Sequence, residues 1–198
     1  QSLLNGNNLI DLVYVIEPSD IIFSKNLNLI EASKKNVVRI KNIQQCKSKI
    51  DIVVIATLSD IRFKYFEEVI RINPRFILLE KVVFQSLEEF DNAILLSKDI
   101  KCFGNLVNRY FKNYEKVRKS VNTKINMFVT GPDFGLLCNS IHYIDLFSFI
   151  INDYDISFTS SIGFNEINNK RGSVFIEGEG EFNFVGNDGS TLKIVSDS

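Results

Sequence analysis

The only histidine of the chain, His142, lies in an apolar stretch that also carries three polar side chains. Cys138, Asn139 and Asp145 flank it within one short segment. An unperturbed imidazole has a pKa of about 6.5, so His142 could exchange a proton at neutral pH as an acid or a base. On a helix, Cys138, His142 and Asp145 would lie on one side, and small polar groups there suit the wall of a cleft. A lone histidine on an apolar helix can equally be a core residue with one hydrogen bond, and the residues alone leave both interpretations open.

A second group of candidates follows apolar runs that are typical of strands. Glu17 comes directly after Leu12–Ile16, where dinucleotide-binding folds place an acidic residue that hydrogen-bonds the ribose 2′-hydroxyl. A carboxylate repels a 2′-phosphate and no arginine adjoins Glu17 in the sequence, so NAD is favoured over NADP. The alternative is a solvated glutamate that ends a strand.

Two further strand ends carry small or charged residues. Ala56, Thr57 and Ser59 follow the run 50–55, and small side chains there would let a ring or a phosphate approach the backbone. Glu80 and Lys81 end the run 75–81, and a partly desolvated lysine can donate to a substrate hydroxyl or help to move its proton. Each group also has a structural interpretation. Ser59 or Asp60 would cap the next helix, and the charged pair would face water at the rim of a sheet.

Alternating strand and helix patterns must position these residues. Up to residue 107 the regular alternation predicts βαβ units and a doubly wound parallel sheet. The expected strands cover 12–16, 50–55, 75–81 and 101–107, and 36–40 could be a further short strand. The expected helices cover 24–34, 61–72 and 86–98, the last with the capping-box pattern S-x-x-E at Ser86 and Glu89.

The pattern changes after residue 107. A charged helix, a strand and the helix that carries His142 lead into short segments with Gly, Asn and Asp turns, and Asn187-Asp188-Gly189 is a strong hairpin signal. These segments cover 156–164, 172–180, 181–187 and 190–196. The sequence therefore predicts two domains, 1–107 with a parallel sheet and 108–198 with helices and an open, mainly antiparallel sheet.

Composition excludes several partners. The chain has 23 basic and 24 acidic side chains, so it has no positive surplus for a nucleic-acid backbone. Cys46, Cys102 and Cys138 do not have metal-site spacing, and neither a second histidine nor a carboxylate cluster accompanies them, so no metal is expected. The sequence shows no signal peptide and no apolar run long enough for a bilayer, which predicts a cytoplasmic protein without a membrane partner.

Four stretches together resemble the Gfo/Idh/MocA family of NAD(P)-dependent oxidoreductases, which includes glucose-fructose oxidoreductase and inositol dehydrogenase. They are IDIVVIATLSD (50–60), ILLEKV (77–82), NLVNRY (105–110) and GLLCNSIHYIDLF (135–147). The resemblance covers the whole chain. It implies a Rossmann domain followed by an α/β domain whose open sheet forms a substrate wall and an interface between identical subunits. It also implies hydride transfer between a nicotinamide cofactor and a carbon of a sugar or nucleotide-sugar.

The resemblance assigns roles to particular residues. Lys81 matches the lysine of the E-K-P motif, which contacts the reacting hydroxyl and the cofactor, and His142 matches an acid/base histidine. Asn108 and Arg109 lie in the N-x-R segment that leads into the second domain, and they are expected to contact substrate, as is Asn139. The expected cofactor contacts are Glu17, Ala56, Thr57, Ser59, Glu80 and Lys81.

The chain departs from the family pattern in three places. Val82 replaces the proline of E-K-P, which is often associated with a cis peptide, and Cys138 stands where many members have an aspartate. These two changes support a competing hypothesis of a non-catalytic relative that binds a ligand or acts as a scaffold. No G-x-G-x-x-G occurs in the sequence, so the glycine-rich loop and a central first strand are expected to precede Gln1. Residues 1–198 alone would then leave two strand edges unpaired and bind cofactor weakly or not at all.

Overall fold

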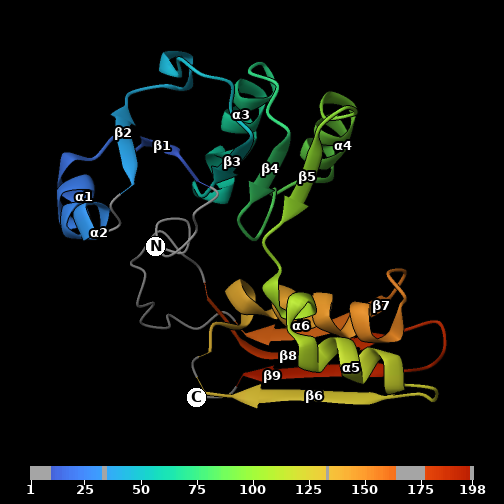
Figure 1. Cartoon of the computed structure of the whole chain (residues 1–198). Coiled ribbons are helices and arrows are strands. Elements are labelled where there is room, and N and C mark those ends of the chain that lie inside the picture. The colour runs from blue at the N-terminus through green and yellow to red at the C-terminus, as the bar shows by residue number, and fades with distance from the viewer. Residues whose placement is uncertain (1–9, 33–34, 133, 164–176, 197–198) are drawn as a thin grey trace. The chain divides into compact units, whose positions relative to one another are not determined.

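The chain forms two compact units, Gln1–Phe103 and Gly104–Ser198. The sequence predicted this boundary a few residues later, after residue 107. The structure is a computed structural model that describes residues 10–32, 35–132, 134–163 and 177–196 (Figure 1). Among these residues, no helix is both long and apolar enough to cross a membrane.

The first unit contains parallel strands and helices in alternation, as predicted. Its elements are β1 (Leu12–Ile16), α1 (Asp20–Lys25), α2 (Leu27–Ala32), β2 (Asn36–Ile40), η1 (Ile43–Gln45), β3 (Ile52–Ile55), α3 (Ser59–Ile70), β4 (Phe76–Leu79), α4 (Leu87–Leu96) and β5 (Lys101–Gly104). Strand β1 pairs in parallel with β2, and β3 pairs in parallel with β4 in a separate sheet of order β3-β4-β5. Among the described residues β1 and β3 each have one neighbouring strand, which is consistent with the expected unpaired edges.

Apolar side chains from α3 and from the segment after β4 form much of the core of the first unit. Phe66, Ile77 and Phe84 are almost fully buried. The Phe84 ring meets the Phe66 ring edge-on with centroids 5.6 Å apart, a favourable arrangement of two aromatic rings. This core holds the start of α3 and the segment after β4 in place.

The predicted cap of α3 is wrong, whereas that of α4 is confirmed. Leu58 occupies the N-cap position of α3 and makes no side-chain capping bond, while the Ser59 hydroxyl accepts a hydrogen bond from Gln85 Nε2 at 3.0 Å. Ser86 caps α4 by accepting from the Glu89 N–H at 3.2 Å. The Glu89 carboxylate accepts from the N–H of Gln85, one residue before the cap.

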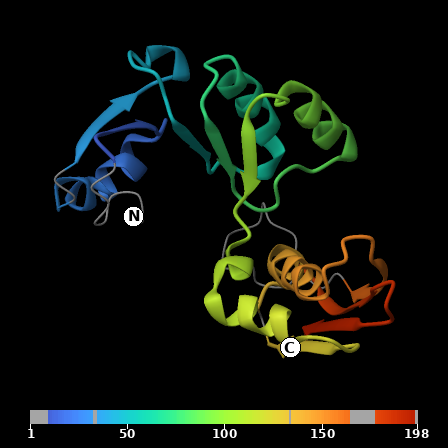
Figure 2. The same ribbon diagram turned by 45° about the vertical axis from the view of Figure 1, so that its right-hand side comes forward.

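The second unit contains a mixed sheet with helices on one face. Its elements are η2 (Val107–Tyr110), α5 (Lys112–Ser120), β6 (Asn126–Gly131), α6 (Leu136–Ile151), β7 (Ser157–Gly163), β8 (Glu179–Val185) and β9 (Thr191–Ser196). The strand order is β6-β9-β8-β7, in which β6 and β9 are parallel and the other pairs are antiparallel. Figure 2 shows α6 lying along one face of this sheet with α5 beside it. The mainly antiparallel sheet predicted from the sequence is confirmed.

Two positions of the second unit, one in a turn and one in a strand, require glycine. The predicted hairpin between β8 and β9 turns at Gly189, whose φ is +82° and whose N–H donates to the carbonyl of Gly186 at 2.9 Å. Strand β8 begins before the predicted break at Gly180 and passes through that residue at φ +129°. A Cβ at Gly180 would lie 2.1 Å from the Ser161 carbonyl oxygen, so only glycine allows β7 to pair this closely. The predicted segments at 164 and 172–176 lie outside the described residues.

Candidate functional site

The strand ends of the first unit bring four of the predicted cofactor contacts to one edge of the sheet. Ile55 is paired with Leu79, and the Glu80 N–H donates to the Ile55 carbonyl at 3.1 Å. The residues that follow β3 and β4 therefore start at the same level, namely Ala56, Thr57, Glu80 and Lys81. In parallel sheets this carboxyl edge is where ligands bind.

The loop after β4 is half-buried and has an unusual backbone. The Lys81 side chain is partly exposed, and the Lys81–Val82 peptide bond is cis although no proline is present. Thr57 Oγ1 in the facing loop is buried and has no hydrogen-bond partner among the described residues.

An arginine that sequence reasoning missed joins these two loops. Arg62 lies in the first turn of α3 and is only 3% exposed. Its Nη1 donates to the carbonyl of Glu80 at 2.6 Å, to that of Val83 at 3.2 Å and to that of Val82, while Nη2 donates to the carbonyl of Thr57. Burial lowers the pKa of Arg62 from its ordinary value, and the nearby carboxylates of Glu80 and Asp60 act in the opposite direction.

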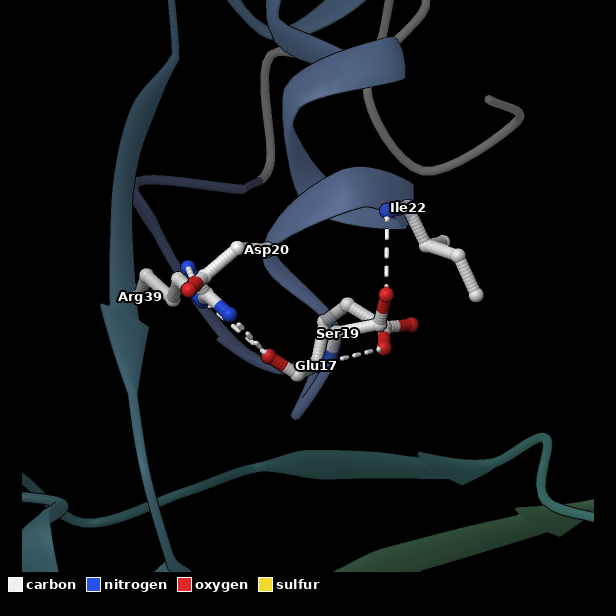
Figure 3. A network of polar contacts seen from close by, with 5 residues as sticks. All are labelled: Glu17, Ser19, Asp20, Ile22 and Arg39. Carbon is white, nitrogen blue, oxygen red and sulfur yellow. Dashed lines mark hydrogen bonds and ion pairs between the residues drawn. The ribbon is translucent and has the colours of Figure 1, made fainter.

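Glu17 lies at the end of β1, as predicted, and an arginine adjoins it in space (Figure 3). Its carboxylate accepts from the Ser19 N–H at 2.9 Å. Arg39, from β2, donates to the Glu17 carbonyl through Nε at 3.0 Å and Nη2 at 2.6 Å, and to the Asp20 carboxylate at 2.6 Å. The guanidinium also lies over the Phe23 ring, 4.6 Å from its centroid.

The sequence showed no arginine beside Glu17, but Arg39 adjoins it in the folded chain, so the preference for NAD on that ground is wrong. Residues 17 and 39 are far apart in sequence, but the parallel pairing of β1 with β2 sets Val15 opposite Arg39. Parallel pairing of the apolar runs 12–16 and 36–40 would have predicted that Arg39 lies near Glu17. An arginine in this position can accept a 2′-phosphate, so the strand end no longer argues for NAD against NADP.

In the second unit, His142 lines a cavity of about 230 Å³. The cavity wall consists of Val107, Asn108, Phe134, Asn139, His142 and Tyr143. Asn108, Asn139 and His142 are three of the predicted substrate contacts, and α6 and η2 bring them together. The Asn108 amide donates to the His142 carbonyl at 3.4 Å, which ties the two elements. The Asn139 amide donates to the carbonyl of Phe134. Amides and an imidazole inside a small apolar rim are suited to hydroxyl groups.

Arg109 is a predicted substrate contact that does not line this cavity. Its Nε donates to Asp145 Oδ2 at 2.9 Å and its Nη2 donates to Oδ1, so the two side chains form a bidentate ion pair. The hydrogen bond from Asp145 raises the pKa of Arg109. Asp145 was expected to lie beside His142 on a cleft wall, but its side chain is 6% exposed and faces Arg109. Cys138 is also outside the cavity wall; it is half-buried and forms no disulfide.

The helix that carries His142 begins at a point fixed by a distant glutamate. Gly135 precedes α6 with φ +79°, and Glu177 Oε1 accepts from the Leu137 N–H at 2.6 Å. A carboxylate there complements the partial positive charge of the helix N-terminus. Sequence reasoning missed Glu177 because it lies 40 residues away from Leu137.

The described residues contain no group of three or more His, Cys, Asp or Glu side chains that could hold a metal ion. The strand ends carry groups that could hold the two ends of a nicotinamide dinucleotide. Glu17 and Arg39 carry groups for an adenosine ribose, and the loops after β3 and β4 offer small side chains and a lysine to the other end. The printed sequence contains no glycine-rich cradle for the pyrophosphate between them.

Comparison with known proteins gives structural likeness without sequence likeness. No family model matches the chain, and no curated protein matches it. The fold matches a "putative myo-inositol dehydrogenase" of Sinorhizobium meliloti with a TM-score of 0.77 and 18% identity, over 99% of this chain and 64% of that one. It also matches a dehydrogenase (MviM) of Clostridium difficile, with a TM-score of 0.71 and 12% identity over 94% of this chain and 61% of that one.

A third match is a "putative nadph-dependent oxidoreductase" of Desulfitobacterium hafniense. Its TM-score is 0.73 at 12% identity, over 96% of this chain and 60% of that one. The chain therefore shares the fold of these solved structures over almost its whole length. It spans about three fifths of the length of these structures.

Proposed function

We propose that this chain belongs to an oxidoreductase that transfers hydride between a nicotinamide cofactor and a hydroxyl-bearing carbon of a sugar or nucleotide-sugar. The observation that carries the proposal is the cavity in which His142 lies between two amides, in a chain with a dehydrogenase fold. Amide groups suit a substrate with several hydroxyls, and the imidazole suits the one hydroxyl that must lose its proton.

The proposed chemistry divides between two side chains. The family resemblance gives Lys81 the hydrogen bond to the reacting hydroxyl, and it gives His142 the removal of the hydroxyl proton. A nicotinamide cofactor, when bound, would supply the hydride acceptor, and the carbon that loses the hydride would become a carbonyl. Asn108 and Asn139 hold neighbouring hydroxyls through their amides.

The cofactor contacts proposed are Glu17, Ala56, Thr57, Ser59, Glu80 and Lys81. The Glu17 carboxylate, oriented by the Ser19 N–H, supports NAD through a bond to the ribose 2′-hydroxyl. Arg39 at the same strand end supports NADP, because its guanidinium can pair with a 2′-phosphate. Binding of both cofactors must therefore be measured.

Calorimetry with NADH and NADPH tests the cofactor half of the proposal. The protein is used with any residues that precede Gln1 in its gene, and residues 1–198 serve as the comparison. We expect saturable binding by the former and weak or absent binding by residues 1–198. Absence of binding for both cofactors in the longer protein contradicts the proposed function, and micromolar binding by residues 1–198 contradicts the need for a glycine-rich loop.

Substitution of the two acid/base candidates tests the chemistry. Lys81→Ala and His142→Ala should each lower kcat/KM by about 100-fold, the loss typical of an acid/base group. Lys64→Ala, an exposed lysine on α3, is the control and should leave kcat/KM unchanged. If turnover survives both substitutions, the proposed roles are wrong.

A second candidate function is that of a non-catalytic relative that binds a sugar or acts as a scaffold. Cys138 favours this function because no carboxylate stands one helical turn before His142. It predicts saturable sugar binding without turnover, and neither alanine variant would then change any measured rate.

Two further parts of the proposal concern the assembly and the compartment. We propose a homo-oligomer through the face of the second sheet that points away from α6, where Phe128 is 62% exposed. Sedimentation velocity measures the oligomeric state.

We also propose the cytoplasm, because none of the three cysteines forms a disulfide, as expected in a reducing compartment. Imaging of a tagged copy in the source cell checks the compartment.

A further inference from the structure

Arg62 is the most buried charged side chain among the described residues. All of its hydrogen-bond acceptors are backbone carbonyls, and they belong to the two loops at the carboxyl edge of β3 and β4. Thr57 belongs to the loop after β3, whereas Glu80, Val82 and Val83 belong to the loop after β4.

The contacts bracket Lys81. Arg62 holds the carbonyl of Glu80 at 2.6 Å and the carbonyl of Val82, so the backbone is fixed on both sides of the lysine. The bond from Nη2 to the Thr57 carbonyl fixes the facing loop to the same group. One side chain therefore sets the distance between the two loops.

A guanidinium is suited to this position and an ammonium is not. Its planar fork carries five N–H donors in a fixed geometry, so a single group can reach carbonyls from two chain segments. All of these bonds come from the two terminal nitrogens, Nη1 and Nη2. The Arg62 Nε has no hydrogen-bond partner among the described residues. Lysine has three donors on one atom and cannot span both loops with the same geometry.

We infer that Arg62 is a positioning residue for Lys81: it joins the loops after β3 and β4 and so places the lysine for the proposed reaction. The inference rests on the proposed function, because it concerns the lysine that would hold the reacting hydroxyl. Misplacement of a reacting group by about 1 Å can cost on the order of 100-fold in rate, so a group that sets loop geometry would affect turnover strongly.

Amide hydrogen exchange measured by NMR tests the joining of the loops without turnover. In Arg62→Met the Glu80 N–H, which donates to Ile55 at the carboxyl end of the strand pair, should exchange about tenfold faster. The Phe76 N–H, which donates to Asp51 at the amino end of the same pair, should stay within about twofold of its original rate. Arg71→Met, an exposed arginine at the end of α3, is the matched control and should change neither amide.

Two results of this experiment overturn the inference. Equal acceleration at Glu80 and Phe76 would make Arg62 a general stabiliser of the unit, and no acceleration at either would mean that it does not hold the loops. If Arg62→Met does not fold, Arg62→Lys replaces it. For the lysine variant we expect about threefold faster exchange at Glu80 alone, and a rate equal to that of the unchanged protein overturns the inference.

The pH profile of kcat/KM tests the positioning of Lys81. The alkaline limb, where the lysine would lose its proton, should shift in Arg62→Lys and stay in place in Arg71→Lys. A purely structural role lowers the amount of folded protein but does not move this limb, so an unmoved limb with faster exchange at Glu80 overturns the positioning role. Failure to bind any nicotinamide cofactor would overturn the proposed function instead, and the exchange result would still decide the role of Arg62 in the loops.

Discussion

Replacement of Asp145 by asparagine should destabilise the second unit much more than the loss of a surface charge. The Asp145 side chain is 6% exposed and accepts two hydrogen bonds from Arg109, whose side chain is 28% exposed. Asparagine keeps one acceptor and turns an NH₂ donor toward the donors of Arg109, so one charge-assisted bond is lost. Such a bond contributes about 1.5–3 kcal/mol, and water cannot replace it at a buried site, so we expect a loss of about 2–3 kcal/mol.

Urea unfolding followed by tyrosine emission measures this loss. The chain has no tryptophan, and four of its six tyrosines follow Gly104, so the signal reports mainly on the second unit. Glu115→Gln is the matched control, because Glu115 forms an ion pair with Lys119 at 2.6 Å on the exposed surface of α5. Water and salt screen that pair, so its loss should shift the transition far less.

A double variant tests whether the loss of stability comes from a buried charge left without its partner. Arg109→Met combined with Asp145→Leu removes both charges and should recover most of the stability, because no buried charge is left without its partner. If Asp145→Asn shifts the urea midpoint no more than Glu115→Gln does, the pair does not hold η2 against α6. If Asp145→Asn instead changes KM for the sugar and leaves the midpoint in place, Arg109 is a substrate contact, as the sequence predicted.

Two further predictions concern cofactor choice and the second sheet. Arg39→Ala should weaken NADPH binding by about tenfold more than NADH binding, because it removes the cation that would face a 2′-phosphate, and calorimetry that shows equal weakening would contradict this. Gly180→Ala should destabilise the second unit by roughly 2–4 kcal/mol, because its Cβ would lie 2.1 Å from the Ser161 carbonyl and φ is +129°. Gly163→Ala on the neighbouring strand has nothing within 4 Å of the added Cβ and should change the free energy of unfolding by less than about 0.5 kcal/mol. Equal shifts for the two glycine variants would refute the steric argument.

Local pattern was sufficient for most of the elements of secondary structure. The apolar run Leu12–Ile16 and the run that contains Ile52–Ile55 form β1 and β3, and the Asn187-Asp188-Gly189 turn joins β8 to β9. These features depend on neighbouring residues, which a sequence displays directly. Gly180 is the exception, because Gly178 and Gly180, two glycines within three residues, suggest a turn. The strand passes through it since the carbonyl of another strand occupies the space that a side chain would need.

The side-chain partners of charged residues could not be read from the sequence. Arg109 pairs with Asp145 across 36 positions, and Arg39 meets the Glu17 carbonyl across 22. In each case the pairing depends on how two elements pack, and no local periodicity encodes that. The resemblance placed Lys81 and His142 at a strand end and on a helix, but it gave no sign that Arg62 would hold the loop around the lysine.

The parallel pairing of β6 with β9 affects how the second unit can form during synthesis. Asn126 of β6 is paired with Thr191 of β9. Strand β6 therefore leaves the ribosome before α6, β7 and β8 are synthesised, and its partner strand follows only after them. Contacts of such sequence separation form slowly, since a long loop must close first. In that interval α5, α6 and the antiparallel pair of β7 and β8 can form, but Met127 and Val129 of β6 stay exposed to other chains until β9 is synthesised. Chaperone dependence should therefore be concentrated in the second unit, and it should end when β9 inserts between β6 and β8.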